Sequence, residues 1–132
     1  MAKYVDGFVL VVPKDKEADY KKMAEEGRDM WMKHGALEYY ECRGDDLKQQ
    51  EMGEEKSRAF AEMAGAKSDE NVWFSFIVFK SKQHRNEVNQ KVMDEINVKY
   101  TDQSGFSVSP IDMKKMAYGG FEVAVEGLKN PK

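Results

Sequence analysis

The sequence is poor in cysteine. Cys42 is the only one among 132 residues, which excludes an internal disulfide and fits a reducing compartment. No apolar run approaches the roughly 20 residues that a membrane span needs. The N-terminus lacks the charged, apolar and small-residue progression of a signal peptide. These absences predict a cytoplasmic protein with no membrane partner.

An excess of positive charge is also missing. The chain carries 21 lysines and arginines against 24 aspartates and glutamates, a net charge of −3. Nucleic-acid binders usually present a basic face, so we do not expect a nucleic-acid partner. The dinucleotide-binding glycine fingerprint, the phosphate loop, paired CxxC motifs and HExxH are absent from the sequence, and no cofactor is predicted.

What is present centres on the stretch from Asn71 to Lys80, N-V-W-F-S-F-I-V-F-K. Alternate residues of a strand face opposite sides. One face therefore receives Val72, Phe74, Phe76 and Val78, and the other receives Trp73, Ser75, Ile77 and Phe79. Because both faces are apolar, a strand here needs cover on both sides.

Hydrophobic periodicity divides the rest of the chain into further elements. It predicts, in order, a strand over Lys3–Val12, a helix over Lys14–His34, a strand over Ala36–Arg43, a charged excursion over 45–66 in which 56–64 fits a short helix, a helix over Lys82–Asn97 capped by Ser81, a loop over Val98–Pro110 and a last strand within Ile111–Val125. The order β-α-β-β-α-β is that of a ferredoxin-like α+β domain, with helices on one face of an antiparallel four-stranded sheet. We expect residues 1–126 to form this one domain and 127–132 to be a frayed tail.

Such a sheet leaves one face open. The smooth aliphatic set containing Val5 and Val9 favours the helices, and Cys42 should face the helices as well. Asp6 then falls on the open face, where Phe74 and Phe76 also lie. A contiguous exposed aromatic patch marks an interaction surface. We therefore predict a homodimer in which two open sheet faces press together.

Several motifs in this order resemble the YbaA-like family of uncharacterised small bacterial proteins. They are Y-V-D-G-F at 4–8, G-A-L at 35–37, E-C at 41–42 followed by G-D-D at 44–46, V-x-F-S-x-I at 72–77 and K-x-M-x-Y-G-G-F-E at 114–122. The resemblance covers most of the chain and implies a ferredoxin-like fold of the dimeric α/β-barrel group. It implies no established activity. The chain departs from the family pattern at Arg43 and in a longer excursion over 45–66.

Asp6 is the sharpest candidate for chemistry, because a carboxylate in mid-strand must be hydrogen-bonded, paired or solvated. Glu41 and Glu122 share its face if the double glycine at 119–120 forms no bulge. No histidine accompanies these carboxylates at a ligand spacing, so no metal site is predicted. The alternative is a set of solvated edge carboxylates. Gly7, Gly119 and Gly120 fit either a floor for a flat ligand or close packing.

These residues support more than one function. The first is a small-molecule binding protein, or a cofactor-free enzyme, with its ligand between the two sheets near Asp6, Phe8, Glu41, Phe74, Phe76, Tyr118 and Glu122. The second is a non-enzymatic interaction module that uses the excursion over 45–66. A third is RNA binding, with Phe8, Phe74 and Phe76 as a stacking platform, but the negative charge counts against it.

Overall fold

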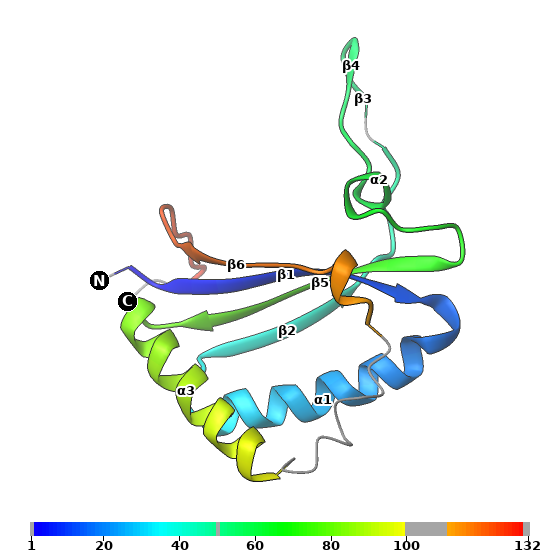
Figure 1. Cartoon of the computed structure of the whole chain (residues 1–132). Coiled ribbons are helices and arrows are strands. Elements are labelled where there is room, and N and C mark those ends of the chain that lie inside the picture. Colours follow the sequence, from blue (N-terminus) through cyan, green and yellow to red (C-terminus); the bar gives the residue numbers. More distant parts are fainter. Residues whose placement is uncertain (1, 50, 100–110, 131–132) are drawn as a thin grey trace.

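The four-stranded sheet takes the predicted ferredoxin-like form in a computed structural model that describes residues 2–49, 51–99 and 111–130. Its strands follow the order β2-β5-β1-β6, and every neighbouring pair is antiparallel. Helices α1 and α3 cover one face (Figure 1). The elements are β1 Tyr4–Pro13, η1 Lys14–Lys16, α1 Glu17–Lys33, β2 Glu38–Arg43, β3 Glu51–Met52, β4 Glu55–Lys56, α2 Phe60–Ala64, β5 Glu70–Phe79, α3 Lys82–Lys99, η2 Met113–Lys115 and β6 Ala117–Glu122.

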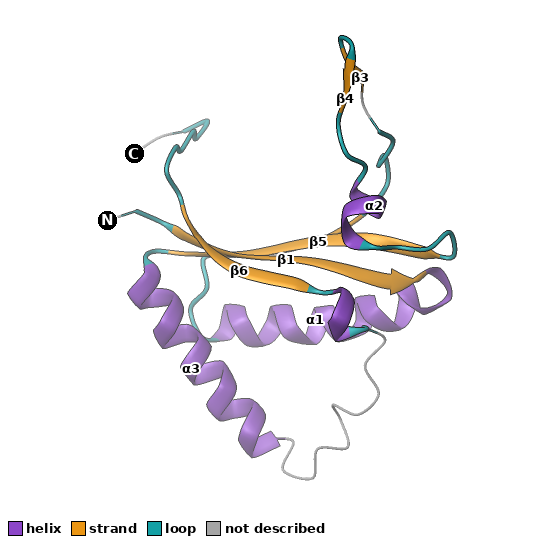
Figure 2. Cartoon of the chain, turned by 45° about the horizontal axis from the view of Figure 1, so that its top comes forward, coloured by secondary structure: helices purple, strands orange, loops and turns teal. Residues whose placement is uncertain are grey.

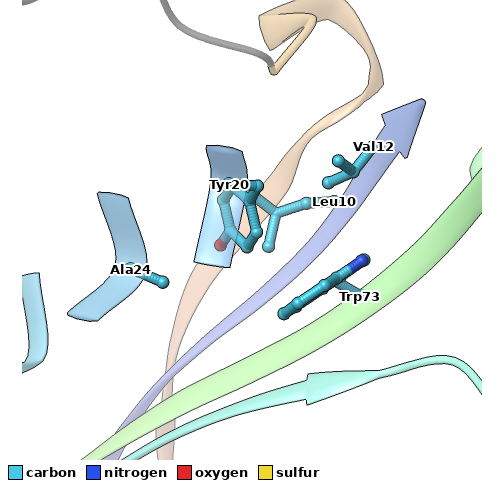
Figure 3. Close-up of a cluster of buried hydrophobic side chains, with 5 residues drawn as sticks. All are labelled: Leu10, Val12, Tyr20, Ala24 and Trp73. Carbon is cyan, nitrogen blue, oxygen red and sulfur yellow. The ribbon is translucent and has the colours of Figure 1, made fainter. Parts of the chain in front are cut away.

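One half of the core lies between α1 and the centre of the sheet (Figure 3). Leu10 of β1 is paired with Trp73 of β5, and both are buried against Tyr20 and Ala24 of α1. The rings of Tyr20 and Trp73 meet edge to face at 4.8 Å. The even-numbered residues of β1 therefore face the helices. The prediction that the set containing Val5 would do so is wrong.

The other half of the core lies under α3. Val88 and Val92 pack one turn apart against Ile77 and Phe79, and all four are buried. The predicted cap is present, since the Ser81 hydroxyl accepts from the backbone N–H of residue 84 at 3.1 Å. Because α3 continues to Lys99, residues 98 and 99 are helical, contrary to the predicted loop. The rest of that loop, residues 100–110, lies outside the described residues.

The charged excursion is more ordered than predicted. Its strands β3 and β4 pair with each other as a separate hairpin, and α2 follows. Figure 2 shows α2 across the sheet from α1, with the hairpin extending away from the same open face. The helix α2 contacts β1 and β5. Its cover explains why Val11 and Val72, which point to the open face, are only 1% and 3% exposed.

The remainder of the open face has no cover within the described chain. Phe74, Tyr40 and Phe121 are 46%, 47% and 62% exposed. Phe76 links two of these rings, at centroid distances of 5.0 Å to Tyr40 and 5.4 Å to Phe74.

Among the described helices, none is long and apolar enough to cross a membrane.

Two valines of α3 test how the helix is held. Val92 is 0% exposed and Val98 is 78% exposed. We expect Val92→Ala to lower the free energy of unfolding by about 2 kcal/mol, because it removes buried methyl groups and leaves a cavity. The matched change Val98→Ala should cost less than about 0.5 kcal/mol. Urea denaturation measures both, and equal losses would contradict the assignment of the buried face of α3.

Candidate functional site

A cavity of about 490 Å³ lies between the sheet and its helices. The sequence predicts a ligand on the opposite, open face, between two sheets. The cavity lies on the helix-covered face because the even-numbered residues of β1 point to the helices. The described lining residues are Phe8, Leu10, Tyr20, Met23, Ala24, Glu26, Gly27, Met30, Trp31, Tyr39, Glu41, Ser75, Ile77, Met93, Ile96, Ile111, Met113 and Met116.

Glu41 forms a polar centre in this mostly apolar lining. Its Oε1 accepts a hydrogen bond from the Tyr20 hydroxyl, and its Oε2 accepts one from the Tyr39 hydroxyl, both at 2.7 Å. Burial and the neighbouring Glu41 carboxylate raise the pKa of both tyrosines. The two hydroxyls therefore stay protonated and hold the carboxylate in place.

Strand geometry brings this group together. Tyr39 and Glu41 are two residues apart on β2 and so share a face, while Glu41 is paired with Ser75 of β5. Tyr20 reaches the carboxylate from α1. Gly27 makes room for Tyr39, because a Cβ at residue 27 would lie 3.0 Å from the Tyr39 hydroxyl. The close approach at Gly27 is thus to a tyrosine side chain.

The walls of the cavity are rich in methionine. Five of the nine methionines contribute: Met23, Met30, Met93, Met113 and Met116. Unbranched thioether side chains adapt to irregular shapes and make favourable contacts with aromatic rings. Such a wall suits a ligand that is apolar or aromatic and is held more by fit than by many hydrogen bonds.

A second cavity, of about 450 Å³, adjoins the first at the edge strand β2. Tyr39 and Glu41 line both cavities. The second is more charged, and its described lining residues are Lys21, Ala24, Glu25, Arg28, Tyr39, Tyr40, Glu41, Arg43 and Trp73. The Glu41 carboxylate thus stands between an apolar interior and a charged outer pocket.

Asp6 is buried under α3, on the helix-covered face rather than on the predicted open face. It is 1% exposed. Asn89 donates to its Oδ2 at 3.3 Å, and Nη1 of Arg85 lies 3.3 Å from its Oδ1. Asn89 is held in turn by Trp31, whose Nε1 donates to the Asn89 Oδ1 at 2.9 Å. The group joins β1, α1 and α3 through polar contacts.

The Asp6–Arg85 pair is not fully satisfied. Their 3.3 Å contact is an ion pair without hydrogen-bond geometry. In the described part of the chain, Oδ1 of Asp6 and Nε of Arg85 have no hydrogen-bond partner. Burial raises the pKa of Asp6, and the opposing effects of Asn89 and Arg85 do not cancel it. Asp6 does not line the 490 Å³ cavity.

The other predicted site residues lie on two faces of the sheet. Phe8, Tyr118 and Glu122 are on the helix-covered face, and Phe74 and Phe76 are on the open face. Phe8 lines the cavity and stacks on Tyr118 at 4.8 Å, on the helix-covered face. Glu122 keeps the parity of Tyr118, because the pairing of β1 with β6 runs without a bulge. Phe8 therefore does not share a face with Phe74 and Phe76, so the three-ring stacking platform is not formed, and the residues predicted to surround one ligand divide between two faces.

Two further expectations have structural outcomes. Cys42 is exposed and paired with Phe74 on the open face, so its predicted helix-facing position is wrong. The Phe121 ring lies over Gly7 and Gly119, and the Tyr4 ring lies over Gly120. These glycines therefore sit beneath the protein's own rings. Among the described residues, no group of three or more His, Cys, Asp or Glu side chains is placed to hold a metal.

Sequence reasoning missed the partners that define the site. Tyr20 and Trp31 fall within the predicted helix over Lys14–His34, but their bonds to Glu41 and Asn89 had no local signal. Arg85 falls within the predicted helix over Lys82–Asn97 and carried no sign of its partner either. The one available clue was the Tyr39–Glu41 spacing, which places a hydroxyl beside a carboxylate on one face of a strand.

The buried Asp6 predicts a pH effect on stability. Because its pKa is raised above the ordinary 3.8, the folded protein binds this proton more tightly than the unfolded chain. The contribution of Asp6 to the free energy of unfolding is fully present below pH 3.8 and is lost as the pH rises through the raised pKa. The free energy of unfolding of the wild type, minus that of Asp6→Asn, should therefore decrease as the pH rises from about 3 to about 7.

Urea denaturation across this range measures the difference. Asp29→Asn, at a side chain that is 71% exposed, controls for the general loss of a carboxylate. A difference for Asp6 that grows with pH would contradict the prediction, since it would mean that the ion pair with Arg85 outweighs burial.

Comparison with known proteins finds relatives that align with nearly the whole chain. It is 37% identical over 124 residues to "Uncharacterized protein YbaA" of Escherichia coli K12, with 94% of this chain and 98% of that protein covered. The match to the protein of the same name from Shigella flexneri has the same identity and coverage.

A solved structure supports the fold. It is described as a dimeric ferredoxin-like protein from an uncultured marine organism, and it matches with a TM-score of 0.59 at 10% sequence identity, covering 96% of this chain and 100% of that one. The family model described as "Protein of unknown function (DUF1428)" matches residues 3–108. The sequence resemblance is thereby confirmed: the chain belongs to the DUF1428 family, which groups it with the YbaA proteins.

Proposed function

We propose that the chain binds a small, mostly apolar molecule in the cavity between the sheet and helices α1 and α3. The observation that carries this proposal is the 490 Å³ cavity itself, lined by apolar side chains around Glu41. Its volume is within the range of about 300–1,000 Å³ typical of ligand pockets. Apolar walls with a few convergent polar groups are the usual character of such sites.

A cofactor-free reaction is compatible with the same site. Glu41 is a carboxylate that faces the cavity, and a carboxylate within hydrogen-bond reach of a ligand proton can serve as a general base. The proposal for binding does not depend on this chemistry.

The methionines offer a direct test of binding. Protein carrying ¹³C-labelled methionine methyl groups is titrated with naphthalene, an apolar probe with two fused rings, and followed by NMR. We expect the Met30 and Met93 signals to shift, because these side chains line the cavity. Met32 and Met63, which are 42% and 53% exposed, are the internal controls. Shifts confined to Met32 and Met63, or no shift up to the solubility limit, would contradict the proposal.

We also propose that the chain forms a homodimer through its open sheet face. Tyr40, Phe74 and Phe76 form a continuous cluster of rings there, and Phe121 adds a further exposed ring. These side chains carry no charge, so an identical copy can cover them without opposing like charges. The solved structure described as dimeric and ferredoxin-like offers a precedent for this assembly.

The β3–β4 hairpin supports the same assembly. The hairpin and α2 extend from the open-face side of the sheet (Figure 2). Strands β3 and β4 are each two residues long and pair only with each other in the described chain. An isolated two-stranded hairpin is marginally stable in water. In a face-to-face dimer, each hairpin would lie beside the partner protomer and gain packing from it.

Two matched substitutions test the dimer. Phe74 and Met32 are 46% and 42% exposed, but Phe74 lies on the open face and Met32 lies on α1. Phe74→Asp should give a folded monomer in analytical ultracentrifugation, because a pair of buried, unpaired carboxylates would oppose association. Met32→Asp should remain dimeric. A monomeric wild type at micromolar concentration, or a dimeric Phe74→Asp, would contradict the proposal.

The excursion also leaves room for the second function considered from the sequence, a protein-interaction module. Residues 45–62 carry six acidic and three basic side chains, so this segment is a negatively charged projection. A partner bound there would have to present basic side chains. Homodimerisation is preferred because the apolar part of the surface is the sheet face rather than the projection.

A further inference from the structure

We infer that Glu41 makes the cavity selective for an aromatic ligand that carries a neutral hydrogen-bond donor, such as a phenolic hydroxyl, and that it excludes a ring carrying a carboxylate. This inference rests on the proposed binding function and specifies its ligand class. It is drawn from the hydrogen bonds around Glu41, which leave acceptor oxygens of this group available to a ligand.

The two tyrosine donors at this end of the cavity are already used. The Tyr20 and Tyr39 hydroxyls each direct their proton to one oxygen of Glu41, at 2.7 Å. Each carboxylate oxygen can accept a second hydrogen bond, and each phenolic oxygen can also accept one. The group made of Glu41, Tyr20 and Tyr39 therefore presents acceptors to the cavity and has no proton of its own left to donate.

The protonation of the two tyrosines reinforces this polarity. The pKa values of Tyr20 and Tyr39 are both raised, by burial and by the carboxylate they bind. Neither hydroxyl gives up its proton near neutral pH, so the arrangement of two donors around one acceptor is retained. A ligand hydroxyl can then donate to Glu41 without displacing either tyrosine.

Charge acts against an anionic ligand. A carboxylate entering beside Glu41 would bring like charges together in an apolar, poorly solvated space, where the repulsion is strong. The nearest basic side chains lining either cavity are Lys21, Arg28 and Arg43, and these line the outer pocket rather than the inner one. A neutral donor avoids the repulsion and gains a charge-assisted hydrogen bond.

The rest of the cavity favours an aromatic ring. Phe8, Trp31 and the methionine side chains supply aromatic faces and polarisable sulfur. These groups bind a flat ring through dispersion and sulfur–aromatic contacts. The ring provides most of the contact area, and the donor fixes its orientation toward β2.

Three probes that share one ring system separate these effects: naphthalene, 2-naphthol and 2-naphthoate. Their dissociation constants are measured by NMR titration on the wild type, on Glu41→Gln and on Glu38→Gln. Glu38 is the matched control, because it is on the same strand, is exposed and accepts its hydrogen bond from Tyr40 on the other face. Thermal denaturation checks that each variant is folded.

For the wild type we expect 2-naphthol to bind about tenfold or more tightly than naphthalene, as for a hydrogen bond to a charged acceptor. The 2-naphthoate ion should bind more weakly than naphthalene. In Glu41→Gln the preference for 2-naphthol should fall to about threefold or less, and 2-naphthoate should gain affinity. Glu38→Gln should match the wild type for all three probes.

The outcomes distinguish this inference from the proposal on which it rests. If naphthalene and 2-naphthol bind the wild type equally, the inference fails and the binding proposal stands. If no probe binds, the binding proposal fails as well. Unchanged preferences in Glu41→Gln, or an equal change in Glu38→Gln, would overturn the role of Glu41. If Glu41→Gln does not fold, the relative affinities of the wild type for naphthalene and 2-naphthol alone test the inference.

Discussion

The structure depends on the pairing register of β1 with β5, the two central strands of the sheet. This register pairs Leu10 with Trp73 and Gly7 with Phe76, and it therefore assigns every side chain of both strands to one of two faces. One face receives α1 and α3, and the core forms there. The other receives α2 at one end and leaves aromatic rings exposed at the other. A shift of one residue would exchange the two faces and remove both the cavity and the aromatic patch.

Two carboxylates of the helix-covered face, the part-buried Glu41 and the buried Asp6, are held by neighbouring polar groups. Glu41 is bonded to Tyr20 of α1 and to Tyr39 beside it on β2, whereas Asp6 is contacted by Asn89 and Arg85 of α3. Their surroundings differ in one respect that matters for function. Glu41 opens onto the cavity, while Asp6 is enclosed and does not reach it. In the proposed function, ligand recognition therefore falls to Glu41 and a structural role to Asp6, in contrast to the emphasis on Asp6 that the sequence suggested.

Much of the fold was predictable, because it depends on patterns that are local in the sequence. The stretch around Phe76 is apolar on both parities, which predicted a central strand covered on both sides, and Ser81 predicted the start of α3. The faces of β1 were not predictable in this way. Both of its parities are largely apolar, so composition could not decide between Val9 and Leu10 as the residue facing the helices. One wrong choice moved the site to the opposite face.

The contacts of the site were harder still to predict. The bond from Tyr20 to Glu41 joins residues 21 positions apart, and that from Asn89 to Asp6 joins residues 83 positions apart. Such contacts follow from the packing of helices on the sheet, and a polar residue on a helix carries no local sign of its partner. The cavity was hard to predict for the same reason. It is the space left between the sheet and the helices, and the sequence pattern of each element shows only which of its residues are buried.

The proposed homodimer requires that the face carrying Phe74 be open in one protomer and covered by a second copy. Cys42 is exposed on that face and is the only cysteine, so the rate at which a thiol reagent labels the wild-type protein reports on it directly. We predict fast labelling at high dilution and slow labelling at concentrations where the protein is dimeric. Slow labelling at every concentration would place Cys42 against the helices, and fast labelling at every concentration would leave the open face without its partner; either result would contradict the account.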